Sequence, residues 1–416
     1  MTRVLLVCPE PLGHGQPAGI GIRFIEMTNV LAADGHPITL LSRDGGAVDN
    51  ATAGVLTPES IARATEDNDV AVVQGHIANE LFAHGKALPT VVDLYDPFII
   101  ENLHYYSERG AEVFSHDHAT LMSSIAHGDF FLCASEAQRL FYLGVMLAAG
   151  RLNPLSFDSV DALIRLAPFG VQQRRAGSQP AHAGHDLLFG GIYDWYDPIL
   201  AIDAVAIARR TMPDLTLTFT THPNPELTPQ GKAADAIEHV RQRSYRDFIR
   251  FEPWIAYDKR AAFFDRFALA LLTFGQSIET DLSMRTRVFD YLWGGLPVIT
   301  SSAPGTDEIL TRYQAGSVWA PPSAGAVPAE AGTQIEALAR TIVSLLSDEQ
   351  RLISMREGAA RFAAEHQWPD VLEPLREFCR NPRFDKRKDA FAVRLQLPER
   401  LPSILDRLKR RIGGAF

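Results

Sequence analysis

Short apolar runs alternate along the chain with longer segments in which apolar residues recur every three or four positions. The first run covers residues 4–7 and a second covers residues 37–41. Between them apolar residues stand at helical spacing, at Ile20, Phe24, Met27 and Leu31. This order predicts a βαβ unit. Further buried strands are predicted at residues 70–73, 90–95 and 130–134, the last followed by a helix around Leu140.

A polar stretch rich in Gly, Ala and Gln interrupts this periodicity at residues 170–186, and we interpret it as an interdomain linker. The alternation then resumes. Strands are predicted at residues 187–191, 215–220, 248–251, 268–274 and 297–300. Helices are predicted at residues 199–209, from about 288, and at 335–346 and 348–365.

Strands that alternate with helices in both halves predict an α/β protein with two facing Rossmann-like, doubly wound domains. Ligands of such sheets bind beyond the carboxyl ends of the strands, so two facing domains create a cleft with a site on each wall. We predict domains at residues 1–170 and 186–372, followed by a basic tail at residues 373–416.

The composition agrees with a globular protein of two domains. The chain has 416 residues, of which 46% are hydrophobic and 22% charged. Its three cysteines lack metal-ligand or redox spacing, which favours free thiols in a reducing compartment. The first apolar run is too short for a signal peptide, and no stretch approaches the roughly 20 apolar residues of a membrane span. We therefore expect a cytoplasmic protein.

Charge is distributed unevenly. Residues 380–416 hold 11 basic and 4 acidic residues, a balance of +7, which leaves −17 for the rest of a chain whose net charge is −10. An acidic body argues against binding to nucleic acid. The basic tail also carries apolar residues and has two interpretations: peripheral contact with an anionic membrane surface, or packing against the acidic N-terminal domain, which we prefer.

The most informative segment for chemistry covers residues 279–299. Ser283, Met284, Arg285 and Thr286 precede a predicted helix that contains Arg287 and Asp290 and ends at two glycines. The start of a helix suits a diphosphate, and the two arginines add positive charge there. Asp290, one turn into the helix, suits the hydroxyls of a ribose. An alternative of equal weight is that both arginines lie in solvent on the helix surface. Asp290 would then only stabilise the positive end of the helix dipole.

This segment resembles the donor-binding segment of the retaining GT-B glycosyltransferases of family 4, also called glycosyl transferases group 1. In that family two carboxylates, separated by seven residues, precede a Gly-x-Pro sequence. Asp290, before Gly295 and Pro297, matches the second carboxylate. The position of the first holds Leu282, so either Glu279, our candidate catalytic residue, or Asp281 takes its place.

The family usually holds the donor diphosphate with an Arg and a Lys in the loop that corresponds to residues 190–198. This chain has Tyr193 and Trp195 there, so the resemblance leaves Arg285 and Arg287 as the nearest candidates for the diphosphate. The resemblance also implies that Trp254 and Ile255 lie at the nucleotide base. Packing of the aromatic side chains is the simpler alternative for both tryptophans.

In the N-terminal half, the resemblance implies that Gly19 and Gly21 border the cleft and that Arg23 reaches a phosphate or the acceptor. A glycine-rich turn that permits tight packing is the alternative. Asp93 and Asp96 lie at the end of a predicted strand and are candidates for binding acceptor hydroxyls or assisting their deprotonation. Asp96 before a proline is also an ordinary turn signal.

The resemblance implies a hexosyltransferase that moves a sugar from a nucleoside-diphosphate sugar to a saccharide, lipid-linked or small-molecule acceptor. Retention of configuration and front-face attack assisted by the leaving diphosphate are implied as well. We expect no metal and no cofactor, because the chain has no HExxH sequence and no Cys/His cluster. The alternatives are a GT-B sugar-nucleotide epimerase, a pseudo-glycosyltransferase, and a non-catalytic partner that binds a nucleotide sugar.

Overall fold

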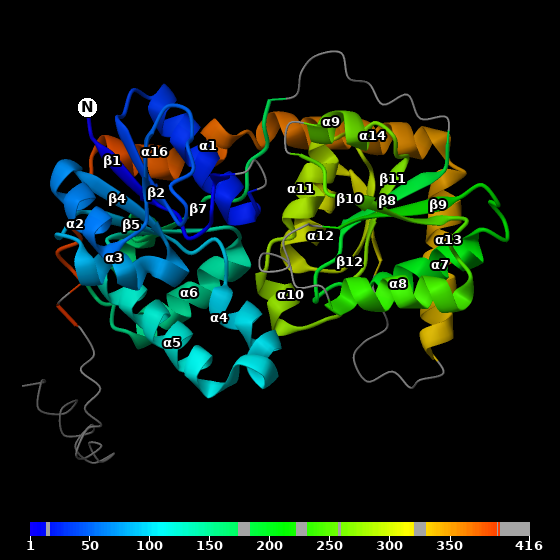
Figure 1. Ribbon diagram of the computed structural model, residues 1–416, viewed down its shortest axis with the longest axis horizontal. Coiled ribbons are helices and arrows are strands. Elements are labelled where there is room, and N and C mark those ends of the chain that lie inside the picture. Colours follow the sequence, from blue (N-terminus) through cyan, green and yellow to red (C-terminus); the bar gives the residue numbers. More distant parts are fainter. Residues whose placement is uncertain are drawn as a thin grey trace, which may run out of the picture.

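The computed structural model describes residues 1–13, 17–173, 184–221, 231–256, 259–319, 330–388 and 390–391. Two parallel sheets form two domains that lie side by side, with the amino-terminal domain coloured blue to cyan and the other mostly green to yellow (Figure 1). The predicted fold of two Rossmann-like domains is confirmed. Most of the predicted linker lies at residues 174–183, outside the described residues.

The first sheet has seven strands in the order β3-β2-β1-β4-β5-β6-β7. Their bounds are β1 Val4–Val7, β2 Ile38–Ser42, β3 Thr52–Val55, β4 Val70–Gln74, β5 Thr90–Asp93, β6 Phe130–Cys133 and β7 Ile164–Leu166. The helices around it are α1 Gly19–Ala33, α2 Pro58–Asp67, α3 Ala78–His84, α4 Phe98–Glu101, α5 Tyr106–His127 and α6 Glu136–Ala148. The short 3-10 helices are η2 Gly75–Ile77, η3 Asn102–Tyr105 and η4 Phe157–Ala162.

The second sheet has six strands in the order β10-β9-β8-β11-β12-β13. Their bounds are β8 Asp186–Gly191, β9 Thr216–Thr221, β10 Ile249–Pro253, β11 Leu269–Leu272, β12 Val298–Ser301 and β13 Gly316–Trp319. The helices that follow the strands are α7 Pro198–Ala208, α8 Gly231–Arg243, α9 Arg260–Phe264, α10 Ile278–Leu282, α11 Thr286–Trp293, α12 Pro304–Tyr313, α13 Glu330–Leu346 and α14 Glu349–Glu365.

The edge strands β3, β7 and β13 were not predicted from the sequence. β3 is largely exposed and β7 has only three residues. A central strand of a parallel sheet is buried on both faces and therefore appears as a continuous apolar run, whereas an edge strand can be short or polar. The pattern of apolar positions therefore identified the middle of each sheet and the edge strand β10, and missed the other three edges.

The chain returns to the N-terminal domain after α14, through α15 Trp368–Val371 and α16 Glu373–Arg380. Trp368, Leu375 and Phe378 are buried in the same hydrophobic cluster as Phe24 of α1. In Figure 1 the orange helix α16 accordingly lies among the blue elements. The carboxyl-terminal helices thus complete the core of the first domain.

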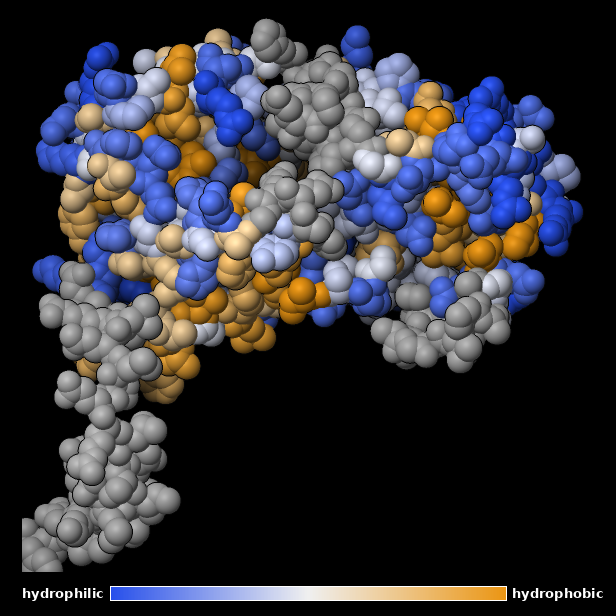
Figure 2. Space-filling model, turned by 60° about the horizontal axis from the view of Figure 1, so that its bottom comes forward, coloured by the Kyte–Doolittle hydropathy of each residue, from blue (hydrophilic) through white to orange (hydrophobic). Residues whose placement is uncertain are grey.

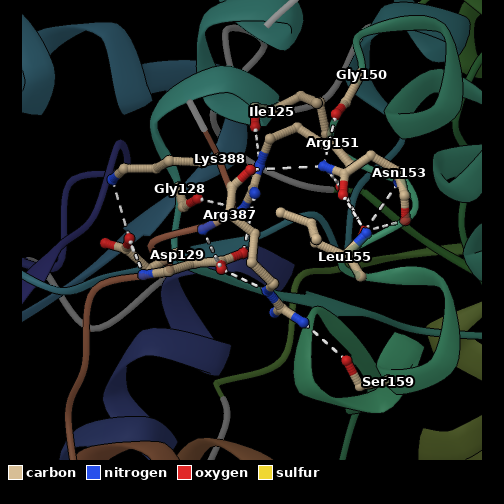
Figure 3. A network of polar contacts seen from close by, with 12 residues as sticks. Ile125, Gly128, Asp129, Gly150, Arg151, Asn153, Leu155, Ser159, Arg387 and Lys388 are labelled. Carbon is tan, nitrogen blue, oxygen red and sulfur yellow. Dashed lines mark hydrogen bonds and ion pairs between the residues drawn. The ribbon is translucent and has the colours of Figure 1, made fainter. Parts of the chain in front are cut away.

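A buried polar network fixes the segment that follows α16 (Figure 3). The Arg151 guanidinium donates to Asp385, 234 residues away, at 2.9 Å. Arg387 donates to the hydroxyl of Ser159, and the Lys388 ammonium donates to Asp129 at 2.9 Å. The predicted basic tail therefore begins on the N-terminal domain, while residues 392–416 lie outside the described residues.

The N-terminal domain exposes several large apolar side chains, and hydrophobic surface is visible on its lower face in Figure 2. Leu140 and Leu147 on α6 are each 63% exposed, and Leu155 and Phe157, near the network of Arg387, are more than half exposed. In the described parts of the chain, no helix combines the length and the apolar character that a membrane span requires.

Candidate active site between the two domains

A cavity of about 270 Å³ lies between the domains, where the carboxyl ends of both sheets meet. From the first domain it is lined by residues after β1 and β5 and by the start of α1. From the second it is lined by residues after β8 and β10 and by the segment that enters α11. The polar and aromatic lining residues are Glu10, Tyr95, Asp96, Glu101, Phe169, Tyr193, Trp195, Tyr196, Thr220, Trp254, Arg260, Phe263, Phe264, Ser283, Arg285, Thr286, Arg287, Asp290 and Tyr291.

Arg287 lies in the first turn of α11, against the end of β8. Gly190 has a φ of +79°, and the strand shifts register between Leu188 and Gly190. A Cβ atom at Gly191 would lie 2.4 Å from Nη2 of Arg287, so the glycine leaves room for the guanidinium. The guanidinium carbon lies 5.0 Å from the ring centre of Tyr193 and 5.5 Å from that of Trp254.

Arg287 forms no salt bridge with a carboxylate in the described part of the chain, in contrast to Arg260 and Arg285. Burial lowers its pKa, but the neighbouring Tyr193 and Tyr291 raise it, and the result lies above the ordinary value for arginine. The side chain therefore stays charged. It is a cation at the cavity whose charge a bound anion can neutralise.

Arg285 is arranged differently, because both of its terminal nitrogens donate to Glu279 at 2.7 Å. Its side chain is 3% exposed and that of Glu279 2% exposed. The guanidinium also lies 4.7 Å from the ring centre of Phe274. Arg285 lines the cavity and Glu279 lies behind it, so the negative charge of Glu279 already compensates the positive charge of Arg285.

Asp290 lines the cavity one turn into α11 and forms a salt bridge with Arg260 of α9. Trp254 and Ile255 follow the end of β10 and line the same wall. Tyr193 and Trp195 stack on each other with ring centres 4.9 Å apart. The loop after β8 therefore offers an aromatic surface to the cavity.

The start of α1 faces the cavity through Gly19, but a carboxylate of the same domain already occupies it. Glu10 accepts a hydrogen bond from the backbone N–H of Gly21 at 2.8 Å. Burial raises the pKa of Glu10 to about 7 although hydrogen bonds from backbone N–H groups lower it. Glu10 therefore lies where the start of α1 could otherwise bind an anion.

Arg23 and Asp93 form a buried ion pair outside the cavity lining. The Arg23 guanidinium donates to both carboxylate oxygens of Asp93, at 2.7 and 2.9 Å, and to the carbonyl oxygens of Ala167 and Pro168. Both side chains are at most 1% exposed. Their mutual bonds stabilise the join between α1, β5 and the residues after β7, so neither side chain is positioned to contact a ligand in this conformation.

Asp96 and Glu101 both line the first domain's wall. The Ser283 hydroxyl, from the other domain, donates to Glu101 at 3.0 Å. Burial raises the pKa of Asp96 to about 6. Burial and the charge of Asp96 raise the pKa of Glu101 well above its usual range.

The same segment of the second domain makes further contacts across the cleft. Met284 packs against the hydrophobic clusters of both domains. Ser283 and Met284 therefore connect the two walls, and Ser283 brings Glu101 close to the segment that enters α11.

The structure brings most of the predicted site residues to one cavity: Gly19, Asp96, Tyr193, Trp195, Trp254, Ile255, Ser283, Met284, Arg285, Thr286, Arg287 and Asp290. It leaves Gly21, Arg23, Asp93 and Glu279 out of the lining. Sequence reasoning missed Glu10 and Arg260. The signal for Glu10 was available, because Glu10 comes soon after the first predicted strand; in the structure it stands three residues beyond β1, as Asp96 stands three residues beyond β5.

No family model and no curated protein sequence matches the chain. Its structure is similar to that of Alr3699/HepE from Anabaena, with a TM-score of 0.65 and 14% identity, over 91% of this chain and 99% of that one. Sucrose-phosphate synthase from Thermosynechococcus elongatus gives a TM-score of 0.64 and 14% identity, over 91% and 98%. WaaG, a glycosyltransferase involved in lipopolysaccharide biosynthesis, gives 0.62 and 14%, over 90% and 98%. With its two facing parallel sheets, the chain has the GT-B fold of these proteins.

Proposed function

We propose that this protein is a glycosyltransferase that moves a hexosyl group from a nucleoside-diphosphate sugar to an acceptor. The observation that carries the proposal is Arg287, a charged guanidinium at the cavity and at the start of α11, with no carboxylate partner in the described residues. A diphosphate there would receive charge-assisted hydrogen bonds from Arg287 and favourable interaction with the helix dipole.

The surrounding residues suit the rest of such a donor. Trp254 and Ile255 would contact the base, and Asp290, held by Arg260, would accept hydrogen bonds from the ribose. Arg285 has its charge compensated by Glu279 and would contribute less to phosphate binding than Arg287. The stacked rings of Tyr193 and Trp195 offer an apolar face of the kind that packs against sugars.

The acceptor would lie against the first domain, where Asp96 and Glu101 face the cavity. Transfer would retain the anomeric configuration: the bond from the anomeric carbon to the diphosphate oxygen breaks, and the acceptor oxygen forms the new bond on the same face. Stabilising the charge of the leaving diphosphate by Arg287 and α11 would be the main catalytic effect. The proposal involves no metal ion and no cofactor.

Two similar structures support this choice of ligand. The structure of Alr3699/HepE was determined in complex with UDP-glucose, and that of the pneumococcal O-GlcNAc transferase GtfA in complex with UDP and GlcNAc. A uridine nucleotide is therefore the first ligand to test. We also propose that the protein acts in the cytoplasm, where its three buried cysteines remain reduced.

A thermal-shift screen with UDP, GDP, dTDP and their sugar conjugates tests the proposal, because a ligand that binds the native state raises its melting temperature. We expect a clear shift with one nucleotide, and loss of that shift in Arg287→Ala. Arg241→Ala is a matched control, because Arg241 pairs with Glu238 on the exposed face of α8. The absence of a shift with every nucleotide would contradict the proposal.

A second candidate is a non-catalytic partner that binds a nucleotide sugar. The aromatic residues at 190–198, where the family usually has an Arg and a Lys, favour it. Such a protein would show the thermal shift but would release no diphosphate with any acceptor. A sugar-nucleotide epimerase or a pseudo-glycosyltransferase would be recognised from its products, the former in the absence of any acceptor.

A further inference from the structure

The two walls of the cavity carry opposite charges. The first domain contributes three acidic residues, Glu10, Asp96 and Glu101, and its described lining residues include no Lys, Arg or His. The second domain contributes three arginines and one carboxylate, Asp290, which is paired with Arg260. A molecule that fills the cavity therefore faces positive charge on the donor side and negative charge on the acceptor side.

Buried carboxylates elsewhere in the protein are paired with cations. Among the described residues, every Asp or Glu that is at most 2% exposed forms a salt bridge, and the pairs are Asp93 with Arg23, Asp129 with Lys388, and Glu279 with Arg285. Such pairing is the usual arrangement, because a carboxylate that leaves water without a positive partner loses much of its solvation energy.

The three carboxyl groups of the first domain's wall have no such partner. None of them forms a salt bridge with a Lys, Arg or His within the described parts of the chain. Glu10 accepts a hydrogen bond from the backbone N–H of Gly21 at 2.8 Å, and Glu101 accepts one from the Ser283 hydroxyl at 3.0 Å, and both donors are uncharged. Burial accordingly raises the pKa of all three carboxyl groups. A cation bound in the cavity would supply the charge that the fold does not.

We propose that the acceptor carries a protonated amine, as in an amino sugar or an aminocyclitol, and that Glu10, Asp96 and Glu101 select it over neutral and anionic acceptors. This inference rests on the proposed function, since it names the class of acceptor for the same cavity. The family resemblance implied only a saccharide, lipid-linked or small-molecule acceptor. An acceptor that bears a phosphate on this side would meet three carboxyl groups and no cation, which disfavours it.

An amino sugar suits this wall in its apolar part as well as in its charge. The ammonium group donates three hydrogen bonds and neutralises negative charge, and the ring hydroxyls can donate to the remaining carboxyl oxygens. Tyr95 and Phe169 line the same wall, with ring centres 5.9 Å apart. Their rings offer an apolar surface to the carbon face of a sugar ring.

Isothermal titration calorimetry with glucosamine, glucose and glucose 6-phosphate tests the proposal, because these probes share one ring and differ in charge. The titrations are made at pH 7 with saturating UDP, which occupies Arg287 and keeps the phosphate of the third probe from binding there. We expect glucosamine to bind at least about 10-fold tighter than glucose, and glucose 6-phosphate to bind more weakly than glucose. The aminocyclitol 2-deoxystreptamine serves as a second amine.

Two variants remove charge while keeping the hydrogen bonds of the wall. Glu10→Gln retains an oxygen for the N–H of Gly21, and Glu101→Gln retains one for the hydroxyl of Ser283. Each should reduce the preference for glucosamine over glucose roughly 3-fold, mainly by weakening the binding of glucosamine. Glu308→Gln is the matched control, because Glu308 is exposed on α12 and should leave the preference unchanged. Melting temperatures confirm that each variant is folded.

Several results would overturn the proposal. Glucose could bind as tightly as both amines, neither amine could bind, or glucose 6-phosphate could bind most tightly of the sugars. An unchanged preference in both Glu10→Gln and Glu101→Gln would also refute the assignment of these residues. Failure of the proposed function is distinguishable, because no nucleotide would then bind, whereas the preference for the amines can be measured without UDP by comparing glucosamine with glucose.

Discussion

Substitution of Gly191 by alanine is expected to weaken nucleotide binding by moving Arg287 without removing its charge. The added Cβ would lie 2.4 Å from Nη2 and 3.1 Å from Cζ of Arg287. The guanidinium is the far end of a flexible side chain, so it can shift away from Tyr193 and Trp254 while the fold persists. Gly191 has no positive φ, unlike its neighbour Gly190, so alanine fits its backbone.

The size of the effect follows from the bonds that Arg287 would make. Hydrogen bonds to charged groups contribute about 1.5–3 kcal/mol. Arg287→Ala should therefore raise the Kd for UDP roughly 10- to 150-fold. Gly191→Ala, which keeps a displaced guanidinium nearby, should raise it by at most about 10-fold. The melting temperature without ligand should change by no more than about 4 °C, because the flexible side chain absorbs the contact.

Isothermal titration calorimetry with UDP and with uridine checks this reasoning. Uridine has no phosphate, so Arg287→Ala should leave its affinity unchanged. The Cβ of Gly191→Ala would also lie 3.3 Å from Cζ3 of Trp254, and any change in uridine affinity measures that contact separately. In the double variant, alanine at Gly191 should add little to the effect of Arg287→Ala on UDP, because its two closest contacts are with that side chain. If Gly191→Ala weakened UDP binding as much in the Arg287→Ala variant as in the wild type, the proposed contact would be refuted.

Three further predictions concern the rest of the molecule. Arg23→Ala leaves Asp93 buried and unpaired and should lower the free energy of unfolding by about 3–5 kcal/mol in urea denaturation, while UDP affinity of the folded protein stays unchanged; a selective loss of affinity would return Arg23 to the site. Glu10 binds its proton more tightly in the folded protein, where its pKa is about 7, than in the unfolded chain, where it is 4.5. The free energy of unfolding should therefore be highest below pH 4.5 and fall as the pH rises to about 7. Glu10→Gln should flatten the dependence of this free energy on pH between these values. If the basic tail covers part of the N-terminal domain, as we propose, removal of residues 392–416 should enlarge the apolar surface around Leu155 and Phe157, which are already more than half exposed, and increase the fluorescence of a hydrophobic dye; an unchanged signal would contradict this packing.

Much of the fold could be predicted from the sequence because the period of apolar positions is a local property. The central strands β1, β4 and β8 appear as apolar runs, and α1, α7 and α14 appear at helical spacing. The edge strand β3 could not be found this way, because its exposed residues need no apolar side chains. The clustering of strand-end residues at one cavity could also be predicted, since the carboxyl ends of parallel strands meet at the same edge of a sheet.

The partners of the charged side chains were decided by the tertiary structure alone. Arg285 and Arg287 could not be distinguished in the sequence, because they lie two residues apart at the start of the same helix. In the structure both line the cavity, but only Arg285 is bonded to Glu279. Arg23 was a candidate ligand until the fold brought it to Asp93, 70 residues away. The spacing of apolar residues along the sequence indicates which side of a helix or strand is buried. The strength of an ion pair instead depends on a distance of a few ångströms between segments, and only the packed chain defines that distance.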